Sequence, residues 1–158
     1  MLHIRQATID DAESIAQLNC AVHEIHAESR PEIFKPLVPD EELTALTRER
    51  LMDSSTYVFI AEVHAEPVGY VLTQVIERAE NVFTYAQRHL LIDQMAVDPK
   101  YRSRSYGEQL MQRVFELARE LNIRRVVLNV WRFNERAVAF YERSGFEMCE
   151  VRMEKYID

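Results

Sequence analysis

The most constraining feature of the sequence is the stretch from residue 90 to residue 118, LLIDQMAVDPKYRSRSYGEQLMQRVFELA. Its pattern predicts a strand that ends at Pro99, then a loop of small and cationic residues, then a helix that starts at about Gly107. The first turn of a helix carries unpaired N–H groups and a partial positive charge. A phosphate placed there accepts those hydrogen bonds, so the stretch indicates a phosphate-binding site.

Two common nucleotide-binding motifs are missing from the sequence. It contains neither GxxxxGK[ST], the P-loop, nor GxGxxG, the dinucleotide fingerprint. The phosphate ligand is therefore of another class. An ordinary surface loop that leads into an amphipathic helix is the alternative interpretation.

The rest of the chain predicts a single domain, residues 1–158, in which strands first follow one another and then alternate with helices. Helices are expected to begin at Asp10, with Glu13 as its capping-box partner, and at Asp40. The expected strands are His3–Ala7, Tyr57–Val63, Val68–Ile76, Leu90–Val97, Arg125–Trp131 and Phe146–Lys155, and two later helices are expected at Gly107–Asn122 and Glu135–Ser144.

Composition limits the class of partner and the cellular compartment that fit this chain. The net charge of −7 argues against a nucleic-acid partner and agrees with a cationic one. The two cysteines are far apart, which fits a reducing cytoplasm better than a disulfide framework. The apolar runs are too short for a membrane span, and the N-terminus is too polar for a signal peptide.

Two segments resemble motifs of the GNAT superfamily of N-acetyltransferases. MAVDPKYRSRSYG, residues 95–107, is similar to the family's motif A, in which a strand leads into a phosphate-binding loop. NERAVAFYERSGF, residues 134–146, is similar to its motif B pattern of Asn-x-x-Ala-x-x-x-Tyr-x-x-x-Gly-Phe. The order of the expected elements agrees with the family over nearly the whole chain.

The resemblance implies a mixed α/β fold: a mostly antiparallel sheet of six to seven strands, flanked by about four helices, with a splayed central strand pair. It implies that acetyl-CoA is the co-substrate and lies between the two splayed strands, and that no metal takes part. It is also compatible with a homodimer. The residues that would contact the coenzyme are Met95, Ala96, Val97, Arg102, Ser103, Arg104, Ser105, Tyr106, Gly107, Glu108, Asn134 and Tyr141.

The loop departs from the family pattern at two positions. Ser103 and Ser105 stand where the family commonly has glycine. Serine tolerates a positive φ poorly. The loop must therefore keep ordinary φ values at both serines or accept strain of about 1 kcal/mol or more.

The resemblance assigns the chemistry mainly to Tyr141, which would give a proton to the departing coenzyme A thiolate. A tyrosine packed on one face of a short helix is the alternative. Asn134 has two interpretations, contact with the coenzyme and a role as the N-cap of the helix, and the two are compatible. Gly145 is expected to end that helix in a left-handed conformation.

The acceptor side is less defined. An alkylammonium must lose its proton before it attacks, and no single base stands out. Asp93 could serve directly or through water, and the imidazoles of His23 and His26 are the other candidates. The expected acceptor contacts are His26, Glu28, Phe34 and Asn129.

These features predict a cytoplasmic N-acetyltransferase that moves the acetyl group of acetyl-CoA to a primary amine of a small molecule or peptide within a ternary complex. A non-catalytic acyl-CoA-binding regulatory module is the alternative, because the two serines depart from the family's phosphate loop.

Overall fold

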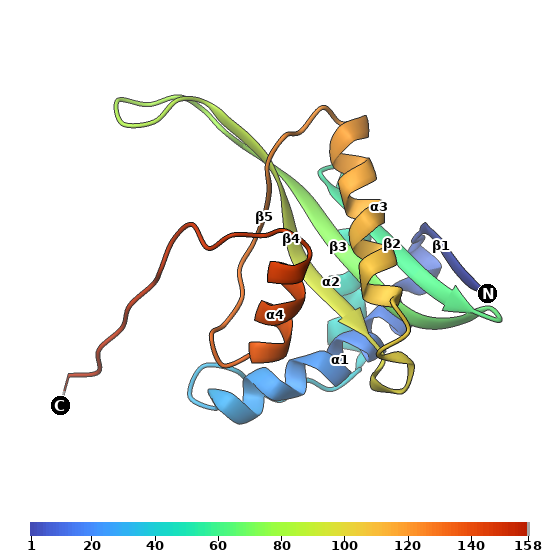
Figure 1. The fold of residues 1–158 in the computed structure, drawn as a ribbon. Coiled ribbons are helices and arrows are strands. Elements are labelled where there is room, and N and C mark those ends of the chain that lie inside the picture. Colours follow the sequence, from blue (N-terminus) through green and yellow to red (C-terminus); the bar gives the residue numbers. More distant parts are fainter. Residues whose placement is uncertain (158) are drawn as a thin grey trace.

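A computed structural model of the protein describes residues 1–157. One sheet runs in the order β1-β2-β3-β4-β5 and is antiparallel except for the parallel pair β4–β5. Its strands are β1 Leu2–Gln6, β2 Thr56–Val63, β3 Glu66–Arg78, β4 Gln87–Val97 and β5 Val126–Leu128. The helices are α1 Ala12–Ser29, α2 Glu41–Met52, α3 Tyr106–Glu120 and α4 Glu135–Arg143 (Figure 1).

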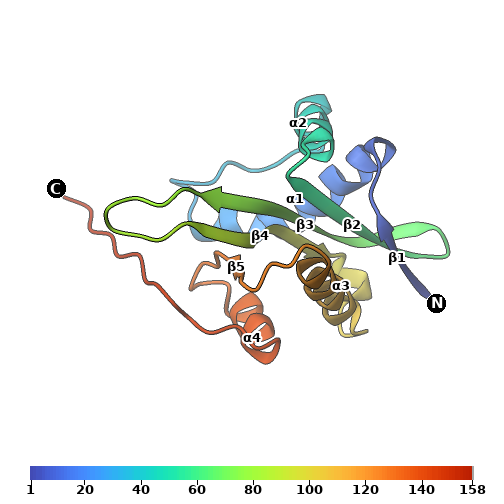
Figure 2. The same cartoon turned by 90° about the horizontal axis from the view of Figure 1, so that it is seen from above.

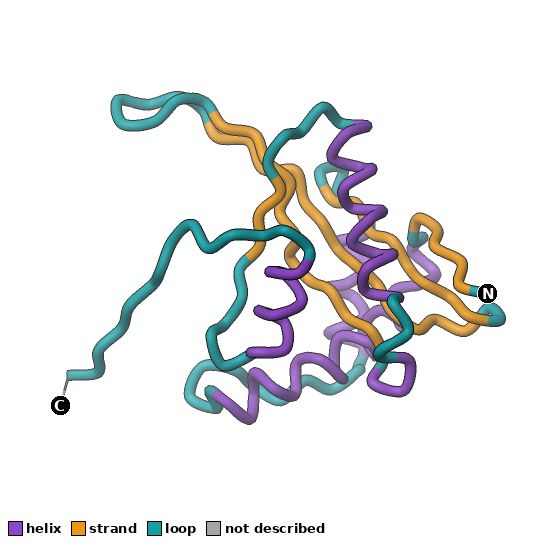
Figure 3. The backbone as a smooth tube through the Cα atoms, viewed as in Figure 1, coloured by secondary structure: helices purple, strands orange, loops and turns teal. Residues whose placement is uncertain are grey.

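The described chain has five strands, so the expectation of six to seven is wrong, while the mixed α/β class and the four helices are confirmed. The missing strand is the one expected at Phe146–Lys155. That segment is extended but pairs with no strand, and it runs away from the body of the protein (Figure 3). Its alternating pattern predicts the extended conformation, but a strand also needs a neighbouring edge to pair with.

The sheet separates two apolar cores. Helices α1 and α2 cover one face, and α3 and α4 lie on the other (Figure 2). On β2 the side chains alternate: Val58 and Ile60 belong to the core under α1, whereas Phe59 and Ala61 belong to the core under α3. The two-residue period of a strand buried on both faces produces this division.

The helix starts follow local polar chemistry. Asp40 caps α2 by accepting a hydrogen bond from the N–H of Leu43 at 3.0 Å, as expected. The expected cap at Asp10 is wrong, because a 3-10 turn, Ile9–Asp11, leads into α1, and its capping box is formed by Thr8 and Asp11. The Asp11 carboxylate accepts the N–H of Thr8 at 2.7 Å and pairs with Arg5, which lowers the pKa of Asp11.

Gly69 lets the sheet close tightly beside the strand that carries motif A. A Cβ added there would lie 2.7 Å from the carbonyl oxygen of Ala96 on β4. Any side chain at this position would therefore push β4 away from β3.

None of the helices within residues 1–157 is long and apolar enough to cross a membrane.

Candidate active site

Strands β4 and β5 separate part-way along their length. They pair at Leu90–Val126, Leu91–Val127 and Ile92–Leu128, and β5 then ends while β4 continues to Val97. Residues 93–97 therefore have no strand beside them on the β5 side (Figure 1). This gap is the splay that the sequence predicts, and it leaves backbone groups of β4 available to an extended ligand.

The gap begins at a one-residue bulge in β4. Leu72 lies opposite Gln94 and Thr73 lies opposite Ile92, so Asp93 has no partner on β3. A bulge of this kind bends the strand and redirects its side chains, and such bulges are frequent next to active sites.

The bulge also reverses which side chains face α3. Leu90 and Ile92 before it, and Met95 and Val97 after it, all pack against the core under α3. Ala96 packs against the core under α1 instead. The motif A part of β4 is thus turned by one residue relative to the part that pairs with β5.

Asp93 is held at the start of the gap by a cation from α2. Its Oδ2 accepts a hydrogen bond from Nη2 of Arg50 at 2.9 Å, and both side chains are about one-third exposed. The carboxylate is therefore fixed in position and open to solvent.

The phosphate loop carries two residues in the left-handed region. Ser103 has φ 61° and Ser105, which directly precedes α3, has φ 58°. Of the two alternatives that the sequence leaves for these serines, the structure adopts the strained one. The conformation that glycine usually supplies is kept, and no side chain of Ser105 caps the first N–H groups of α3.

Two arginines lie close together, and the nearby Asp98 forms no ion pair with either of them. Arg102 in the loop is partly buried, and burial together with the nearby Arg136 of α4 lowers the pKa of the Arg102 guanidinium. No acid among residues 1–157 forms an ion pair with Arg102, Arg104 or Arg136. Cations that repel one another fit an anionic ligand such as a pyrophosphate.

Three elements converge at Gly107. A Cβ added to this first-turn residue of α3 would lie 3.2 Å from Cε2 of Phe140 on α4 and 3.8 Å from Cε of Met95 on β4. The missing side chain therefore allows α4 to approach the gap. The sequence predicts a role for Gly107 beside the phosphate, and the structure gives it this packing role as well.

Tyr141 follows Phe140 directly and shares its environment. Its ring meets Phe140 and Phe146 edge-on, with ring centroids 5.3 and 5.8 Å away. Burial raises the pKa of the phenol, so it stays protonated at neutral pH. Its hydroxyl makes no hydrogen bond within the described chain, which leaves it free to donate to a ligand.

Asn134 and Gly145 define the two ends of α4. The Asn134 Oδ1 accepts the N–H of Ala137 at 3.3 Å, so the N-cap role is confirmed. Gly145 has φ 90° and ends the helix as expected.

An aromatic cluster joins α1 to the connection between β5 and α4. The ring of His26 lies 5.2 Å from Phe34 and 5.6 Å from Phe133, and Phe34 lies 5.4 Å from Trp131. Burial and the neighbouring His23 lower the pKa of His26, and its Nδ1 is buried without a hydrogen-bond partner.

The other expected acceptor residues lie at the margin of this cluster. Glu28 is exposed on α1 and does not take part in the cluster. Asn129 is exposed and directly follows β5, where the gap begins. Within the described part of the chain, no three His, Cys, Asp or Glu side chains gather as a metal ion would require.

Comparison with known proteins decides the family. Residues 20–146 match the model of the Acetyltransferase (GNAT) family. The chain belongs to this family. GNAT proteins use acetyl-CoA, and the free edge of β4, the loop cations and the start of α3 together fit such a ligand.

Individual relatives agree with the GNAT assignment. Over 98 residues the chain is 36% identical to the uncharacterized N-acetyltransferase MJ1207 of Methanocaldococcus jannaschii, a match that covers 59% of this chain and 40% of that protein. The chain thus spans less than half of that relative.

Solved structures share the GNAT fold. A tetramutant of the BH1408 protein from Bacillus halodurans superimposes with a TM-score of 0.90 at 22% identity, covering 98% of this chain and 99% of that one. A predicted acetyltransferase from Clostridium acetobutylicum, solved with acetyl-CoA, has a TM-score of 0.73 at 19% identity, covering 99% and 96%.

Sequence reasoning misses two cations of the site. Arg136 stands in the first turn of α4, where the helix dipole disfavours a positive charge, and that unfavourable position is a signal in the sequence. Arg50 has no such signal, because only the packing of α2 brings it to Asp93.

The strain at the two serines leads to a prediction. We expect Ser103→Gly and Ser105→Gly each to raise the free energy of unfolding by about 0.5–1 kcal/mol, since glycine adopts a positive φ without the Cβ penalty. Acetyl-CoA should bind at least as tightly, because the loop N–H groups remain. Denaturant unfolding and calorimetric titration measure both effects.

Ser54→Gly is the matched control, since Ser54 lies in a turn but is not among the residues with positive φ. This substitution should lower stability, because glycine adds entropy to the unfolded chain. A loss of stability in the loop variants similar to that of Ser54→Gly would show that the left-handed loop is not the conformation in solution.

Proposed function

We propose that this GNAT chain transfers the acetyl group of acetyl-CoA to a primary amine of a small molecule or peptide, by direct transfer within a ternary complex. The observation that carries the proposal is the convergence at Gly107 of β4, the start of α3 and α4. This convergence brings the unpaired edge of β4 beside the start of α3 and beside α4, the helix that carries Arg136 and Tyr141.

Acetyl-CoA, when bound, supplies a thioester carbonyl that an amine can attack and a thiolate that departs. In our proposal the backbone of Met95–Val97 orients the pantetheine arm, and residues 102–108 with Arg136 hold the pyrophosphate. Asn134, as the cap of α4, positions the helix beside the coenzyme.

Two side chains of the gap would manage the protons. Tyr141 donates its phenolic proton to the sulfur as the C–S bond breaks, and its raised pKa keeps that proton available at neutral pH. Asp93 takes the proton that the amine loses, directly or through a water, while Arg50 fixes the carboxylate. The N–C bond forms as the C–S bond breaks, so the chain ends the cycle with one proton to return to Tyr141.

Tyr141→Phe tests the catalytic proposal. We expect kcat to fall by about a hundredfold or more, with little change in the dissociation constant of acetyl-CoA, because the substitution removes only the donated proton. Thiol release with a panel of amines measures kcat, and calorimetry measures binding.

Tyr57→Phe, on β2, is the matched control and should keep full activity. If the native protein binds acetyl-CoA but releases no thiol with any amine, the chain is a regulatory acyl-CoA-binding module instead. Unchanged kcat in Tyr141→Phe would remove Tyr141 from the mechanism and leave the enzyme proposal standing.

We place the acceptor beside the aromatic cluster. Phe34 and His26 would contact the apolar stem of the amine, and Asn129 lies where β5 ends. Glu28, exposed on the last turns of α1, would attract a cationic amine. The low pKa of His26 keeps the imidazole neutral at pH 7, so it does not repel that cation.

The acceptor proposal predicts how activity depends on pH and charge. Between pH 6 and 9, kcat/KM should rise, because more of the amine, with a pKa near 10, is deprotonated. His26→Gln should keep this slope, since His26 is already neutral over most of that range.

Glu28→Lys should raise KM for a cationic amine, whereas Glu13→Lys, at the other end of α1, should not. If Glu28→Lys and Phe34→Ala both leave kcat/KM unchanged, the acceptor binds elsewhere.

A further inference from the structure

Two neighbouring polar side chains at the bulge of β4 face the same side of the sheet. Ile92 and Met95, which flank them, pack against the core under α3. Asp93 bonds Arg50 of α2, and Gln94 bonds residues of α1 and β3, so both side chains lie on the face that α1 and α2 cover (Figure 2). In a regular strand one of the two would face the other way. The bulge therefore creates a pair of adjacent polar groups at the start of the gap.

Tyr70 determines which way round the Gln94 carboxamide lies. The Tyr70 side chain, on β3, is completely buried in the core under α1, and burial raises the pKa of its phenol, so the hydroxyl keeps its proton. A buried hydroxyl proton without an acceptor costs free energy. The acceptor that this hydroxyl finds within residues 1–157 is Oε1 of Gln94, at 2.9 Å. The oxygen of the carboxamide therefore faces Tyr70.

Asn19 supports the same orientation from α1. Its Nδ2 donates to the same Oε1 of Gln94 at 3.4 Å. Because two donors occupy the oxygen, the Nε2 group of Gln94 points away from both of them. Nε2 makes no hydrogen bond within the described chain, and it is not one of the buried polar atoms there that lack a partner. It is therefore an accessible hydrogen-bond donor.

The neighbouring Asp93 offers the opposite chemistry. An ionised carboxylate only accepts hydrogen bonds, and Oδ2 of Asp93 already accepts one from Arg50 at 2.9 Å. The side chain is about one-third exposed, so the carboxylate is open to a further donor. Consecutive Cα atoms lie about 3.8 Å apart. One acceptor and one donor on the same face at this spacing suit two adjacent groups of one small molecule.

One face of α1 leads from this polar pair to the aromatic cluster. Asn19 and His26 are seven residues apart on α1, which is two turns of the helix and about 10 Å. They therefore lie on the same face, with Asn19 against Gln94 and His26 against Phe34. An acceptor that reaches from the cluster to Asp93 passes Gln94 on the way.

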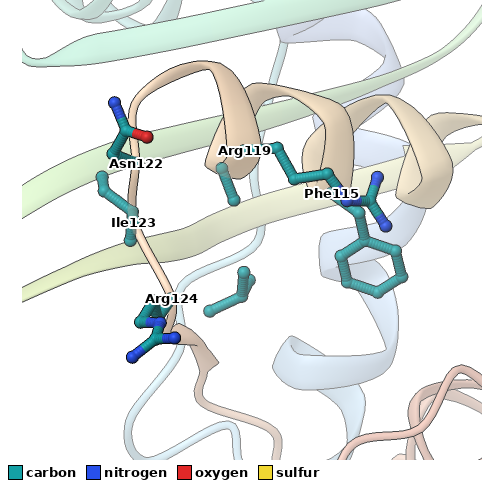
Figure 4. Close-up of a pocket in the computed structure, with 7 residues that line it drawn as sticks. Phe115, Arg119, Asn122, Ile123 and Arg124 are labelled. Carbon is teal, nitrogen blue, oxygen red and sulfur yellow. The ribbon is translucent and has the colours of Figure 1, made fainter.

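A hollow on the other face of the sheet fits a cationic amine less well. It has a volume of about 630 Å³ and lies beside β5 at the end of α3 (Figure 4). Arg119 and Arg124 line it, and their charges repel an ammonium group. The sheet separates this hollow from the side chains of Asp93 and Gln94. The polar pair is therefore the better place for the amine.

We propose that Gln94 binds the acceptor and selects amines with a hydrogen-bond-accepting oxygen on the carbon next to the one that bears the nitrogen. Nε2 of Gln94 donates to that oxygen while Asp93 accepts from the amine. Tyr70 is a positioning residue, because its hydroxyl holds the carboxamide with the donor outward. Carbonyl, hydroxyl and ether oxygens share this chemistry. The inference rests on the proposed acetyl transfer and names the class of amine that the site takes.

A matched pair of amines tests the selection. Methoxyethylamine and butylamine have the same length and differ by one ether oxygen in place of one methylene. The ratio of their kcat/KM values, compared between a variant and the native chain, cancels both the difference in basicity of the amines and any loss of folded protein. We expect Gln94→Glu to lower the preference for methoxyethylamine about five- to tenfold, because a carboxylate still accepts from Tyr70 but donates to no oxygen.

Two further variants separate the role of Gln94 from effects of charge and packing. Tyr70→Phe should lower the same preference by a smaller factor, because the carboxamide is then free to turn, whereas a purely structural loss would leave the ratio unchanged. Gln17→Glu is the matched control, since it adds the same charge at an exposed position on α1, two residues from Asn19 and thus on the opposite side of the helix. It should leave the ratio unchanged.

A second pair of amines, glycinamide and isobutylamine, shows which oxygen is preferred. The two share a branched shape, and only glycinamide has a carbonyl oxygen at the required position. A larger effect of Gln94→Glu on this pair than on the first identifies a carbonyl, and a smaller one identifies an ether or hydroxyl oxygen.

The outcomes distinguish this inference from the proposed acetyl transfer. An unchanged ratio for both pairs in Gln94→Glu would overturn the role of Gln94 while the acetyl transfer stands. Thiol release with other amines but with no member of either pair would do the same. Absence of thiol release with every amine would overturn the acetyl transfer, and this inference with it.

Discussion

The extra residue at Asp93 is the constraint on which the site depends. It changes which side chains of β4 face α3, and it lies directly after Ile92, where the parallel pairing with β5 ends. The bulge turns Met95 and Val97 toward α3 and leaves their β5 side open. Gly69 supports this arrangement from the other side, because only a residue without a Cβ lets β3 approach the carbonyl of Ala96 so closely.

Electrostatics then give the gap its ligand preference. The chain carries a net charge of −7, yet the loop and the start of α4 bring Arg102 and Arg136 together, and the nearby Asp98 offsets their repulsion only in part. Arg102 is half-buried and Arg136 is exposed, and the repulsion between their charges costs free energy in the free protein. A bound pyrophosphate would remove that cost, so the local repulsion favours binding of the coenzyme. The left-handed conformation of Ser103 and Ser105 fits the same ligand, because it is the loop conformation that leaves N–H groups available to an anion.

Local chemistry determined what could be predicted from the sequence. The caps at Asp40 and Asn134 and the break at Gly145 depend on neighbouring residues, and all three predictions are confirmed. The bulge at Asp93 could not be predicted, since it exists only in the register with β3. The strand expected at residues 146–155 was wrong for a related reason: the pattern predicts an extended chain but does not say whether a sheet edge is there to pair with it. The cap expected at Asp10 was wrong because the chain enters α1 through a 3-10 turn, whose capping box is formed by Thr8 and Asp11.

Hydrogen–deuterium exchange of the full chain with and without acetyl-CoA tests the central claim most directly. The account predicts slower exchange at residues 94–97, on the open side of β4, and at residues 102–108, where the loop meets α3. Residues 90–92, which already pair with β5, should change little. Unchanged exchange in both segments, or protection confined to residues 115–126, would contradict the assignment of the gap beyond Asp93 as the coenzyme site.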